Sequence, residues 1–319
     1  RRCAASAAGE KSVGVDIAKD TLDVHLHPAG LSRRLANDAG GWSALIAWLG
    51  GFVVARLAFE PTGAYHRGFE RTLAAAGLPL CKVNPRQARR FAEAIGRHAK
   101  TDAVDAAMLA RFAALLEPPA RPVVSAVLDE MKEQHVARRA LVKDRTAALN
   151  RNHQRRSALL RRQAAERLRQ IERQIDAIDA ALRAHLAADP ALKARFDILV
   201  SIPGVGEATA FTLLIEMPEL GAIEPKGAAS LAGLAPVARD SGRHRGKRSI
   251  RGGRASLRQA LYMPALAAVR FNATMKAKYD AFLAAGKPPK VALTAIMRKI
   301  VILANALIRD RRAWTPKLA

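Results

Sequence analysis

The stretch SVGVDIAKDTLDVHLH, residues 12–27, indicates the fold with which the chain begins. Residues 12–18 form a short apolar run, and residues 21–27 alternate apolar and polar side chains with the period of a β-strand. Lys19 and Asp20 lie between the two runs and suit the turn of a hairpin. The sequence therefore predicts two antiparallel strands at the start of an α/β domain.

The first of these strands has two unlike faces. Side chains alternate across a strand, so Gly14, Asp16 and Ala18 share one face. The other face is apolar and carries Val13, Val15 and Ile17. In a sheet covered on both sides, an isolated carboxylate is costly unless it is paired or binds a metal. Asp16 is therefore a candidate site residue.

The pattern that follows the hairpin is typical of a mixed α/β sheet. We expect a third strand at 32–37, strands at 52–59 and 78–84, and helices at 41–50, 63–76, 85–96 and 101–116. The resulting order, β-β-β-α-β-α-β-α-α, matches the RNase H-like nuclease fold. That fold builds its active site from carboxylates.

Three further carboxylates extend the candidate site. Glu60 directly follows the strand 52–59, and strand ends are where open α/β sheets place ligands. Asp102 and Asp105 are three residues apart on a predicted helix, so both point to one face. Together with Asp16 they offer the oxygen ligands that Mg²⁺ prefers. Two such ions can clamp the attacking and leaving oxygens of a phosphoryl transfer.

Each of these carboxylates also has a simpler explanation. Glu60 can close a turn, and Asp102 can stabilise the N-terminus of its helix. Asp105 can pair with Lys100 or Arg111. The four together, rather than any one alone, favour a metal site.

The chain divides into three predicted parts. Residues 1–120 form the α/β domain, and the proline-rich segment 117–122 leads into a helical arm at 121–190. A basic, mostly α-helical domain follows at 191–319.

The arm carries a coiled-coil pattern. Its apolar residues step by three and four, at Leu168, Ile171, Ile175, Ile178 and Leu182. A preceding antiparallel helix with a turn near 151–157 completes a helical hairpin. The hairpin either packs only on its own chain or forms a dimerisation arm, and the sequence alone does not separate the two.

The last domain opens with a glycine-rich turn, IPGVG at residues 202–206. Gly204 and Gly206 precede an apolar helix, a pattern typical of a helix-hairpin-helix whose backbone N–H groups bind a phosphate. An ordinary tight turn between two helices would show the same sequence pattern.

A basic run, ARDSGRHRGKRSIRGGRASLRQAL at residues 238–261, carries one serine at its head, Ser241. We expect a phosphate-binding loop here, because the run has seven cations and no acid after Ser241. The predicted nucleic-acid contacts are Arg243, Arg245, Lys247, Arg248, Arg251, Arg254 and Arg258, with Lys100, Gly204 and Gly206 elsewhere.

The net charge favours a polyanionic partner. The chain has 53 Lys and Arg against 28 Asp and Glu, a formal charge of +25. A cationic membrane-surface protein would need bulky aromatic anchors, and aromatics make up only 5% of the residues. The longest apolar tract is interrupted by Arg298 and Lys299, so no membrane span is expected. Two cysteines provide neither a disulfide framework nor a zinc site, and no signal peptide is evident at the N-terminus, which fits the cytoplasm.

Fragments along nearly the whole chain resemble the DEDD transposases of bacterial insertion sequences, the family numbered one hundred and ten. They are GVDIAK, FEPTGAYHRGFERTLAAAG, KVNPRQARRFAEAIGRHAKTDAVDAAMLA, IPGVGEATAFTLL, LAGLAPVARDSG and LRQALYMPALAAVR, in the family's order. One departure is the segment RGGRASLRQAL, where Gly253 and Arg254 stand in place of the family's frequent Gly-Asn.

The resemblance implies a RuvC-like N-terminal domain whose DEDD set falls on Asp16, Glu60, Asp102 and Asp105, with Mg²⁺ as cofactor. It also implies a coiled coil and a C-terminal domain whose nucleophilic serine falls on Ser241. The partners implied are donor and target DNA, a structured bridge RNA that pairs with both, and further copies of the chain in a homodimer or homotetramer. The resemblance also implies that the protein is cytoplasmic and associated with the bacterial nucleoid.

Three other functions can be drawn from the same residues. A junction-resolving RNase H-like endonuclease, in which water attacks, would use the carboxylates but not the basic serine run. An architectural nucleic-acid-binding protein would need the charge alone and would leave Asp16 unexplained. A tyrosine recombinase would use Tyr262, but its apolar helix favours a core role for that residue.

Overall fold

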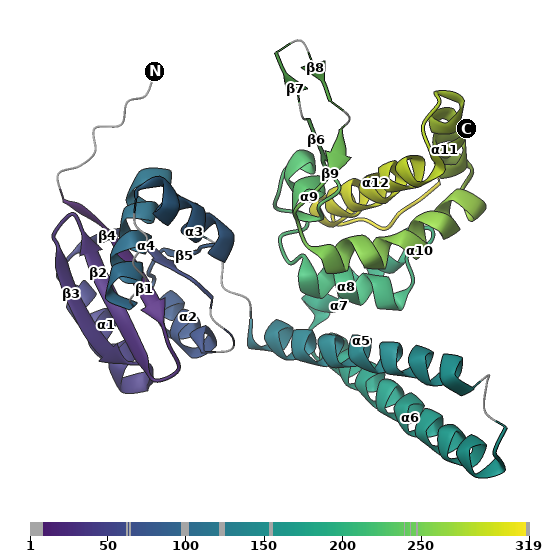
Figure 1. The fold of residues 1–319 in the computed structure, drawn as a ribbon, viewed down its shortest axis with the longest axis horizontal. Coiled ribbons are helices and arrows are strands. Elements are labelled where there is room, and N and C mark those ends of the chain that lie inside the picture. The colour runs from purple at the N-terminus through teal and green to yellow at the C-terminus, as the bar shows by residue number, and fades with distance from the viewer. Residues whose placement is uncertain are drawn as a thin grey trace. The chain divides into compact units, whose positions relative to one another are not determined.

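A computed structural model describes residues 9–61, 63, 65–96, 102–120, 125–152, 156–238, 240–242, 244–246 and 248–316, with the backbone alone at 102, 103, 244 and 245. The chain forms two compact units, residues 1–123 and 124–319 (Figure 1). Each unit has a hydrophobic core of its own.

The first unit is built on a mixed five-stranded sheet in the order β3-β2-β1-β4-β5. Its strands are β1 (Glu10–Ile17), β2 (Thr21–His27), β3 (Leu31–Ala36), β4 (Val53–Phe59) and β5 (Leu80–Lys82). β1, β2 and β3 pair antiparallel in sequence order, whereas β4 joins β1 in parallel and β5 joins β4 in parallel. The predicted hairpin and the strand predicted at 52–59 are confirmed.

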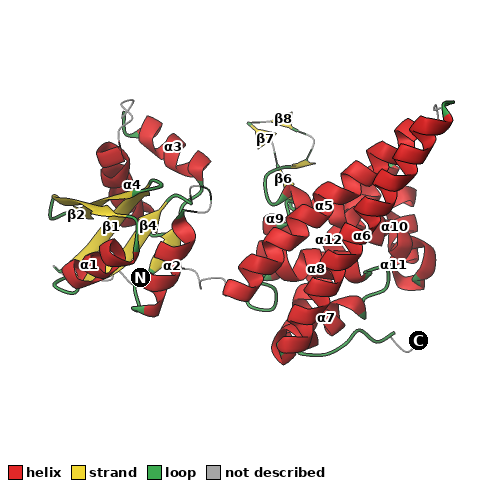
Figure 2. Cartoon of the chain, turned by 90° about the horizontal axis from the view of Figure 1, so that it is seen from below, coloured by secondary structure: helices red, strands yellow, loops and turns green. Residues whose placement is uncertain are grey.

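Helices cover both faces of this sheet, as Figures 1 and 2 show. On one face, α1 (Ala39–Leu49) and α2 (His66–Ala75) pack Leu45 and Phe69 against the apolar sides of β1, β2 and β4. On the other face, α3 (Pro85–Ala94) contributes Ala88 and α4 (Asp102–Leu116) contributes Met108 and Phe112 to a core with residues of β4 and β5. The order β-β-β-α-β-α-β-α-α matches the prediction and is compatible with an RNase H-like fold.

Polar residues fix where two of these helices begin. The Asp38 carboxylate accepts a hydrogen bond of 2.8 Å from the Gly41 N–H and caps α1. Asn84 caps α3 in the same way through the Arg86 N–H, and Pro85 occupies the first helical position, where no N–H is needed.

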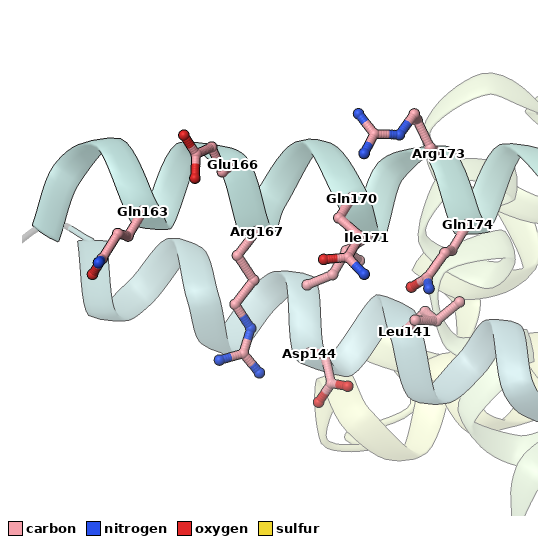
Figure 3. Close-up of a pocket in the computed structure, with 9 residues that line it drawn as sticks. All are labelled: Leu141, Asp144, Gln163, Glu166, Arg167, Gln170, Ile171, Arg173 and Gln174. Atoms are coloured by element: carbon pink, nitrogen blue, oxygen red, sulfur yellow. The ribbon is translucent and has the colours of Figure 1, made fainter.

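The arm is a helical hairpin of α5 (Ala126–Asn152) and α6 (Ala158–Ala188). Ile171, Ile175 and Leu182, which the sequence places at a and d positions, are buried. Met131 and Leu182 also belong to the core of the helices that follow, so the arm and those helices share one unit. Farther out, polar side chains that include Asp144, Arg167 and Gln170 line an open groove between α5 and α6 (Figure 3). A coiled coil formed between two copies stays a prediction.

The rest of the second unit is largely α-helical, as expected. Its helices are α7 (Pro190–Val200), α8 (Glu207–Glu216), α9 (Pro225–Leu231), α10 (Ala255–Phe271), α11 (Ala273–Ala284) and α12 (Pro289–Arg309). Among the helices that the structure describes, α12 alone is long and apolar enough to cross a membrane by length and composition. Of its most apolar window, 56% is buried inside the unit, and a core helix passes the same test.

The basic run is not the loop that the sequence predicts. It forms a narrow β-ribbon in which β6 (Pro236–Val237) pairs with β9 (Ser249–Ile250) and β7 (Asp240–Ser241) pairs with β8 (His244–Arg245). Figure 1 shows this ribbon standing out from the helices of its unit. Strands of two residues are too short to show an alternation of apolar and polar side chains, so the periodicity that reveals other strands is missing here.

Candidate active site

Gly14 brings helix α4 into contact with strand β1. A Cβ atom at Gly14 would lie 2.0 Å from the Ala106 carbonyl oxygen and 2.3 Å from the Ala110 nitrogen. Only glycine leaves room for the backbone of α4 at this point. Asp16 is two residues farther along β1 and therefore projects from the same face that α4 covers.

Glu60 lies beside Asp16 at the ends of two parallel strands. Val15 on β1 is the register partner of Phe59 on β4, and Asp16 and Glu60 are the next residue of each chain segment. Both carboxylates are half-buried. The register therefore brings two of the four predicted carboxylates together at the carboxyl ends of the strands.

The direction of α4 brings Asp105 to the same end of the sheet. At the far end of the helix, Glu117 forms an ion pair of 3.0 Å with Arg56, whose register partner on β1 is Ser12, two residues before Gly14. The first turn of α4 must then lie toward the carboxyl ends of β1 and β4. Asp105, half-buried, directly precedes the residue that touches Gly14.

Asp102 begins α4, but its side chain lies outside the described part of the structure. Within the described residues, no three His, Cys, Asp or Glu side chains gather closely enough to hold a metal ion. The shared end of the sheet, rather than a formed ion cage, is what the structure establishes for Asp16, Glu60 and Asp105.

A fifth carboxylate, Asp23, stands next to Asp16. The two are register partners on the antiparallel strands β1 and β2, so they project from the same face. Asp23 pairs with Arg34 on β3 at 3.1 Å. Asp23 is not among the residues predicted for the site. Its place could have been found from the sequence, because Asp16 and Asp23 are equally far from the Lys19–Asp20 turn and so pair across the hairpin.

A polar cluster lies at the same end of the sheet, at the start of α2. The Lys82 ammonium is 2.7 Å from the carboxylate of Glu70, which is buried. His66 lies 3.9 Å from the same carboxylate and 6.1 Å, ring to ring, from Phe59, the residue before Glu60. Burial lowers the pKa of His66, and the Lys82 ammonium lowers it further, while Glu70 opposes both effects. The net effect favours the neutral imidazole of His66.

Ser241 is exposed near the tip of the β-ribbon. It is the register partner of His244, and Gly242 begins the two-residue turn between them with φ +55°. Hairpin turns of this length require positive φ, which explains why a glycine follows the serine. Arg243 and Lys247 lie outside the described residues, as do Lys100 in the first unit and the side chain of Arg245.

The ribbon is held at its root by two arginines that the sequence assigned to phosphates. Arg254 makes a two-pronged ion pair with Glu219, at 2.6 and 2.9 Å, and also donates to the Glu216 carbonyl at 2.6 Å. Arg258 donates to the Gly252 carbonyl. These contacts argue for a structural role of both arginines, whereas Arg248 and Arg251 are exposed.

Two glycines close the same root. A Cβ atom at Gly253 would lie 2.2 Å from the Gly233 nitrogen, and one at Gly233 would lie 2.1 Å from the Arg258 guanidinium. The segments that join the ribbon to α9 and α10 are thus closely packed against each other. The exposed Ser241 therefore extends from a tightly packed root.

The glycine-rich turn between α7 and α8 also has a packing role. Gly204 has φ +88°, and a Cβ atom there would lie 2.5 Å from the Pro264 carbonyl of α10. Gly206, which precedes the first residue of α8, is exposed and has open space around it. A phosphate contact at this turn stays a prediction, and Gly206 is the better placed of the two. Tyr262 is 43% exposed, so the core role expected for it is wrong.

Comparison with known proteins gives concordant matches over both units. The DEDD transposase model of the IS110 family matches residues 13–162, and a model described as "Transposase IS116/IS110/IS902 family" matches residues 196–280. The pilin gene-inverting proteins of Moraxella lacunata and Moraxella bovis are each 29% identical over 96% of this chain and 98% of their own. An uncharacterized 43.6 kDa protein of insertion element IS110 from Streptomyces coelicolor is 34% identical over 46% of this chain and 36% of its own.

Proposed function

The chain belongs to the IS110 family of DEDD transposases, and from this premise we propose that it cuts and rejoins DNA through a covalent bond to Ser241. As a member of that family it is a DNA transposase, and DNA is its substrate. We propose in addition the covalent chemistry of the serine, the bound metal and the guide RNA.

The observation that carries the proposal is the placement of Ser241. An exposed hydroxyl lies near the tip of a ribbon that also carries exposed Arg248 and Arg251, nearer its root, and the root is fixed by Arg254 and Glu219. A structural serine would be expected to hydrogen-bond within the fold. A nucleophile must instead reach a phosphate, and a projecting ribbon allows that.

The reaction has two balanced steps. The Ser241 hydroxyl attacks the scissile phosphorus, the bond from phosphorus to the 3′ oxygen breaks, and the proton that the serine gives up is balanced by the proton that the leaving 3′ oxygen takes up. The 5′ phosphate stays on the serine, and a 3′ hydroxyl is released. A 3′ hydroxyl of another strand then attacks the phosphoserine, which forms a new phosphodiester and returns the serine hydroxyl. The number of phosphodiesters is unchanged, so the exchange needs no external energy source.

The carboxylates Asp16, Glu60, Asp102 and Asp105 would hold Mg²⁺. Asp16 and Glu60 stand at neighbouring strand ends and Asp105 approaches from α4, and hard oxygen donors of this kind suit a divalent cation. When bound, the cation polarises the phosphate and stabilises negative charge on its oxygens. Arg248 and Arg251 would hold neighbouring phosphates and keep the strand in line with the serine.

Ser241 and the carboxylates lie in different units, and the proposed chemistry needs both. Exposed apolar residues support assembly through the arm: Leu149, Leu159 and Leu160 are 46–53% exposed near its far end. We propose that copies of the chain pair there, as a homodimer or homotetramer. A structured bridge RNA would pair with donor and target DNA and would account for much of the +25 charge.

Rejoining, rather than cutting alone, agrees with the relatives. The two Moraxella proteins are named for inverting a gene, which requires both steps. The place of action would be the cytoplasm, at the nucleoid, where chromosomal DNA lies.

The direct test is covalent trapping. Ser241→Ala should abolish the protein–DNA adduct seen on a denaturing gel while DNA binding persists, and Ser249→Ala on the same ribbon should retain the adduct. Asp105→Asn should lose strand exchange, as should the unaltered protein in EDTA. Cleavage by Ser241→Ala without any adduct would replace this proposal with the water-using junction endonuclease. Binding with neither cleavage nor exchange by the unaltered protein would favour an architectural role.

A further inference from the structure

Asn37 joins three segments of the first unit that are distant in sequence. It lies between β3 and α1, and its backbone N–H donates to the Asp20 carbonyl at 3.0 Å. Its side-chain Nδ2 donates to the Ala18 carbonyl at 2.8 Å and to the Tyr65 carbonyl at 3.2 Å. The Lys19 carbonyl lies slightly farther from the same nitrogen, at 3.4 Å. One amide group therefore ties the turn between β1 and β2 to the segment that leads into α2.

The orientation of the Asn37 amide is fixed by Trp42. The indole Nε1–H of Trp42 donates to Asn37 Oδ1 at 2.9 Å. An indole nitrogen can only donate and a backbone carbonyl can only accept, so the amide oxygen must face Trp42 and the NH₂ group must face the carbonyls. An aspartate has no NH₂ group and could not make the same contacts. The position therefore requires an amide.

Gly68 in α2 makes room for the Trp42 ring. A Cβ atom at Gly68 would lie 2.2 Å from Cη2 of Trp42 and 2.9 Å from its Cζ2. Glycine inside a helix is unfavourable, because it has more backbone freedom to lose on folding than any other residue. The close approach of the ring is a physical reason for glycine here. Trp42 itself packs against the apolar core on this side of the sheet, so the amide is held by a fixed neighbour.

The carbonyls that Asn37 binds belong to the two segments that carry Asp16 and Glu60. Ala18 follows Asp16 by two residues, and Tyr65 follows Glu60 by five. The last register pair of β1 and β4 lies one residue before each carboxylate. Asn37 thus links the two segments beyond the point to which the strand pairing extends.

We propose that Asn37 is a positioning residue that fixes the separation of the Asp16 and Glu60 carboxylates and thereby sets how tightly they hold Mg²⁺. This role rests on the proposed function, in which both carboxylates are metal ligands. Asn37 acts through the backbone of the two segments and lies outside the DEDD set. Removing a group that orients metal ligands in this indirect way typically lowers metal affinity or activity by about 10–100-fold.

The test compares Asn37→Ala with Asp38→Ala in the full chain. The Asp38 carboxylate caps α1 through the Gly41 N–H, so its loss removes a side-chain hydrogen bond from the same junction but leaves the two segments tied. Trp42→Phe keeps the ring and removes only the N–H that orients Asn37. It serves as the milder variant should Asn37→Ala fold poorly.

Three quantities are measured for each protein. The first is the rise of Tm with MgCl₂ in the absence of nucleic acid. The second is the rate of DNA strand exchange, at saturating and at limiting DNA and over a series of MgCl₂ concentrations. The third is amide hydrogen–deuterium exchange of residues 16–20 and 60–66 in the metal-free protein.

We expect Asn37→Ala to raise the Mg²⁺ concentration for half-maximal strand exchange by about 10–100-fold. The rate at saturating DNA should fall while the half-saturating DNA concentration stays the same, and hydrogen exchange should become faster in both segments. Trp42→Phe should shift these quantities in the same direction by a smaller factor. Asp38→Ala should lower Tm without moving the Mg²⁺ midpoint. Equal midpoints and equal rates in Asn37→Ala and Asp38→Ala would overturn the role of Asn37.

Failure of the proposed function would be recognised separately. An unaltered protein that exchanges DNA as fast in EDTA as in Mg²⁺ would refute the metal site. The rate of Asn37→Ala relative to Asp38→Ala would then still decide whether Asn37 positions the two carboxylates. If the unaltered protein exchanges no DNA at all, the rise of Tm with MgCl₂ and the hydrogen exchange decide it in the same way.

Discussion

Asp23 on β2 is the register partner of Asp16 on β1, and its carboxylate is paired with Arg34 on β3 at 3.1 Å. Two like charges directly opposite on antiparallel strands repel each other. Arg34 offsets that repulsion for Asp23, which leaves the charge of Asp16 directed toward the end shared with Glu60. The strand pairing therefore tunes the electrostatics of the proposed metal site from outside the DEDD set.

Loss of Arg34 should make the carboxylates at this end of the sheet bind a cation more tightly. In Arg34→Gln the Asp23 charge is no longer neutralised, so Mg²⁺ should stabilise the protein more and half-maximal exchange should need less Mg²⁺. Asp23→Asn should shift the requirement toward higher Mg²⁺. The measurements are Tm and exchange rate in a Mg²⁺ titration.

Arg33→Gln is the matched control, because Arg33 lies over the Trp48 ring at 4.8 Å and takes no part in the Asp23 pair. It should leave the Mg²⁺ midpoint where it was. Equal midpoints in Arg34→Gln and Arg33→Gln would show that Asp23 does not influence the site.

Gly14→Ala should damage both stability and exchange. The added methyl group would meet the Ala106 carbonyl and the Ala110 nitrogen of α4, neither of which can rotate away. Overpacking of this kind costs about 1–3 kcal/mol, and moving α4 also moves Asp105 relative to Asp16. Chemical denaturation gives the free energy of unfolding. Gly9→Ala, at a glycine with nothing within 4 Å, should be silent, and a Gly14→Ala protein as stable as Gly9→Ala would contradict the close packing.

Glu219→Gln should slow strand cleavage more than it weakens DNA binding. The change removes the charged partner of Arg254 at the root of the ribbon, a half-buried contact worth about 1.5–3 kcal/mol. The serine would then be held less firmly, while the exposed arginines remain. Single-turnover adduct formation at saturating DNA separates the two effects.

Glu207→Gln breaks an ion pair with Arg183 that is more than half exposed, so it should change little. If Glu219→Gln forms the adduct at the unaltered rate, Arg254 and Glu219 do not position Ser241. Weaker binding with a normal adduct rate would return Arg254 to the phosphate role expected from the charge run.

The sequence predicts the α/β unit well because its elements obey local periodicity. β2 alternates strictly, β4 is apolar at every position but Arg56, and caps such as Asn84 mark where helices begin. Even the Asp16–Asp23 pairing is implicit, since a hairpin turning at Lys19 and Asp20 fixes its own register. The sequence does not single out this pairing, because an aspartate at position 23 fits the polar face of an amphipathic strand.

The second unit was harder to predict because its decisive contacts are distant in sequence. Nothing in the charge run shows that Arg254 will find Glu219, 35 residues earlier, while Arg251 remains exposed. Composition identifies a basic domain, but only packing separates structural cations from those left for a ligand.

His135 on α5 should make the second unit sensitive to acid. The Thr212 hydroxyl donates to the Ala208 carbonyl at 2.8 Å, so its oxygen must accept the contact of 3.1 Å from His135 Nε2–H. The buried Nδ1 then carries no proton and has no partner within the described residues. Burial lowers the pKa of His135, and a second proton would find no acceptor. Below pH 6.5 the unfolded chain therefore binds a proton that the folded chain resists, and the free energy of unfolding should fall, by at most about 1.4 kcal/mol per pH unit.

His135→Gln keeps a donor for Thr212 but cannot titrate, so its stability should change less between pH 7 and pH 5, whereas His185→Gln on α6 should retain the full slope. Denaturant unfolding at several pH values measures this, and parallel slopes in all three proteins would exclude His135 as the acid-sensitive group.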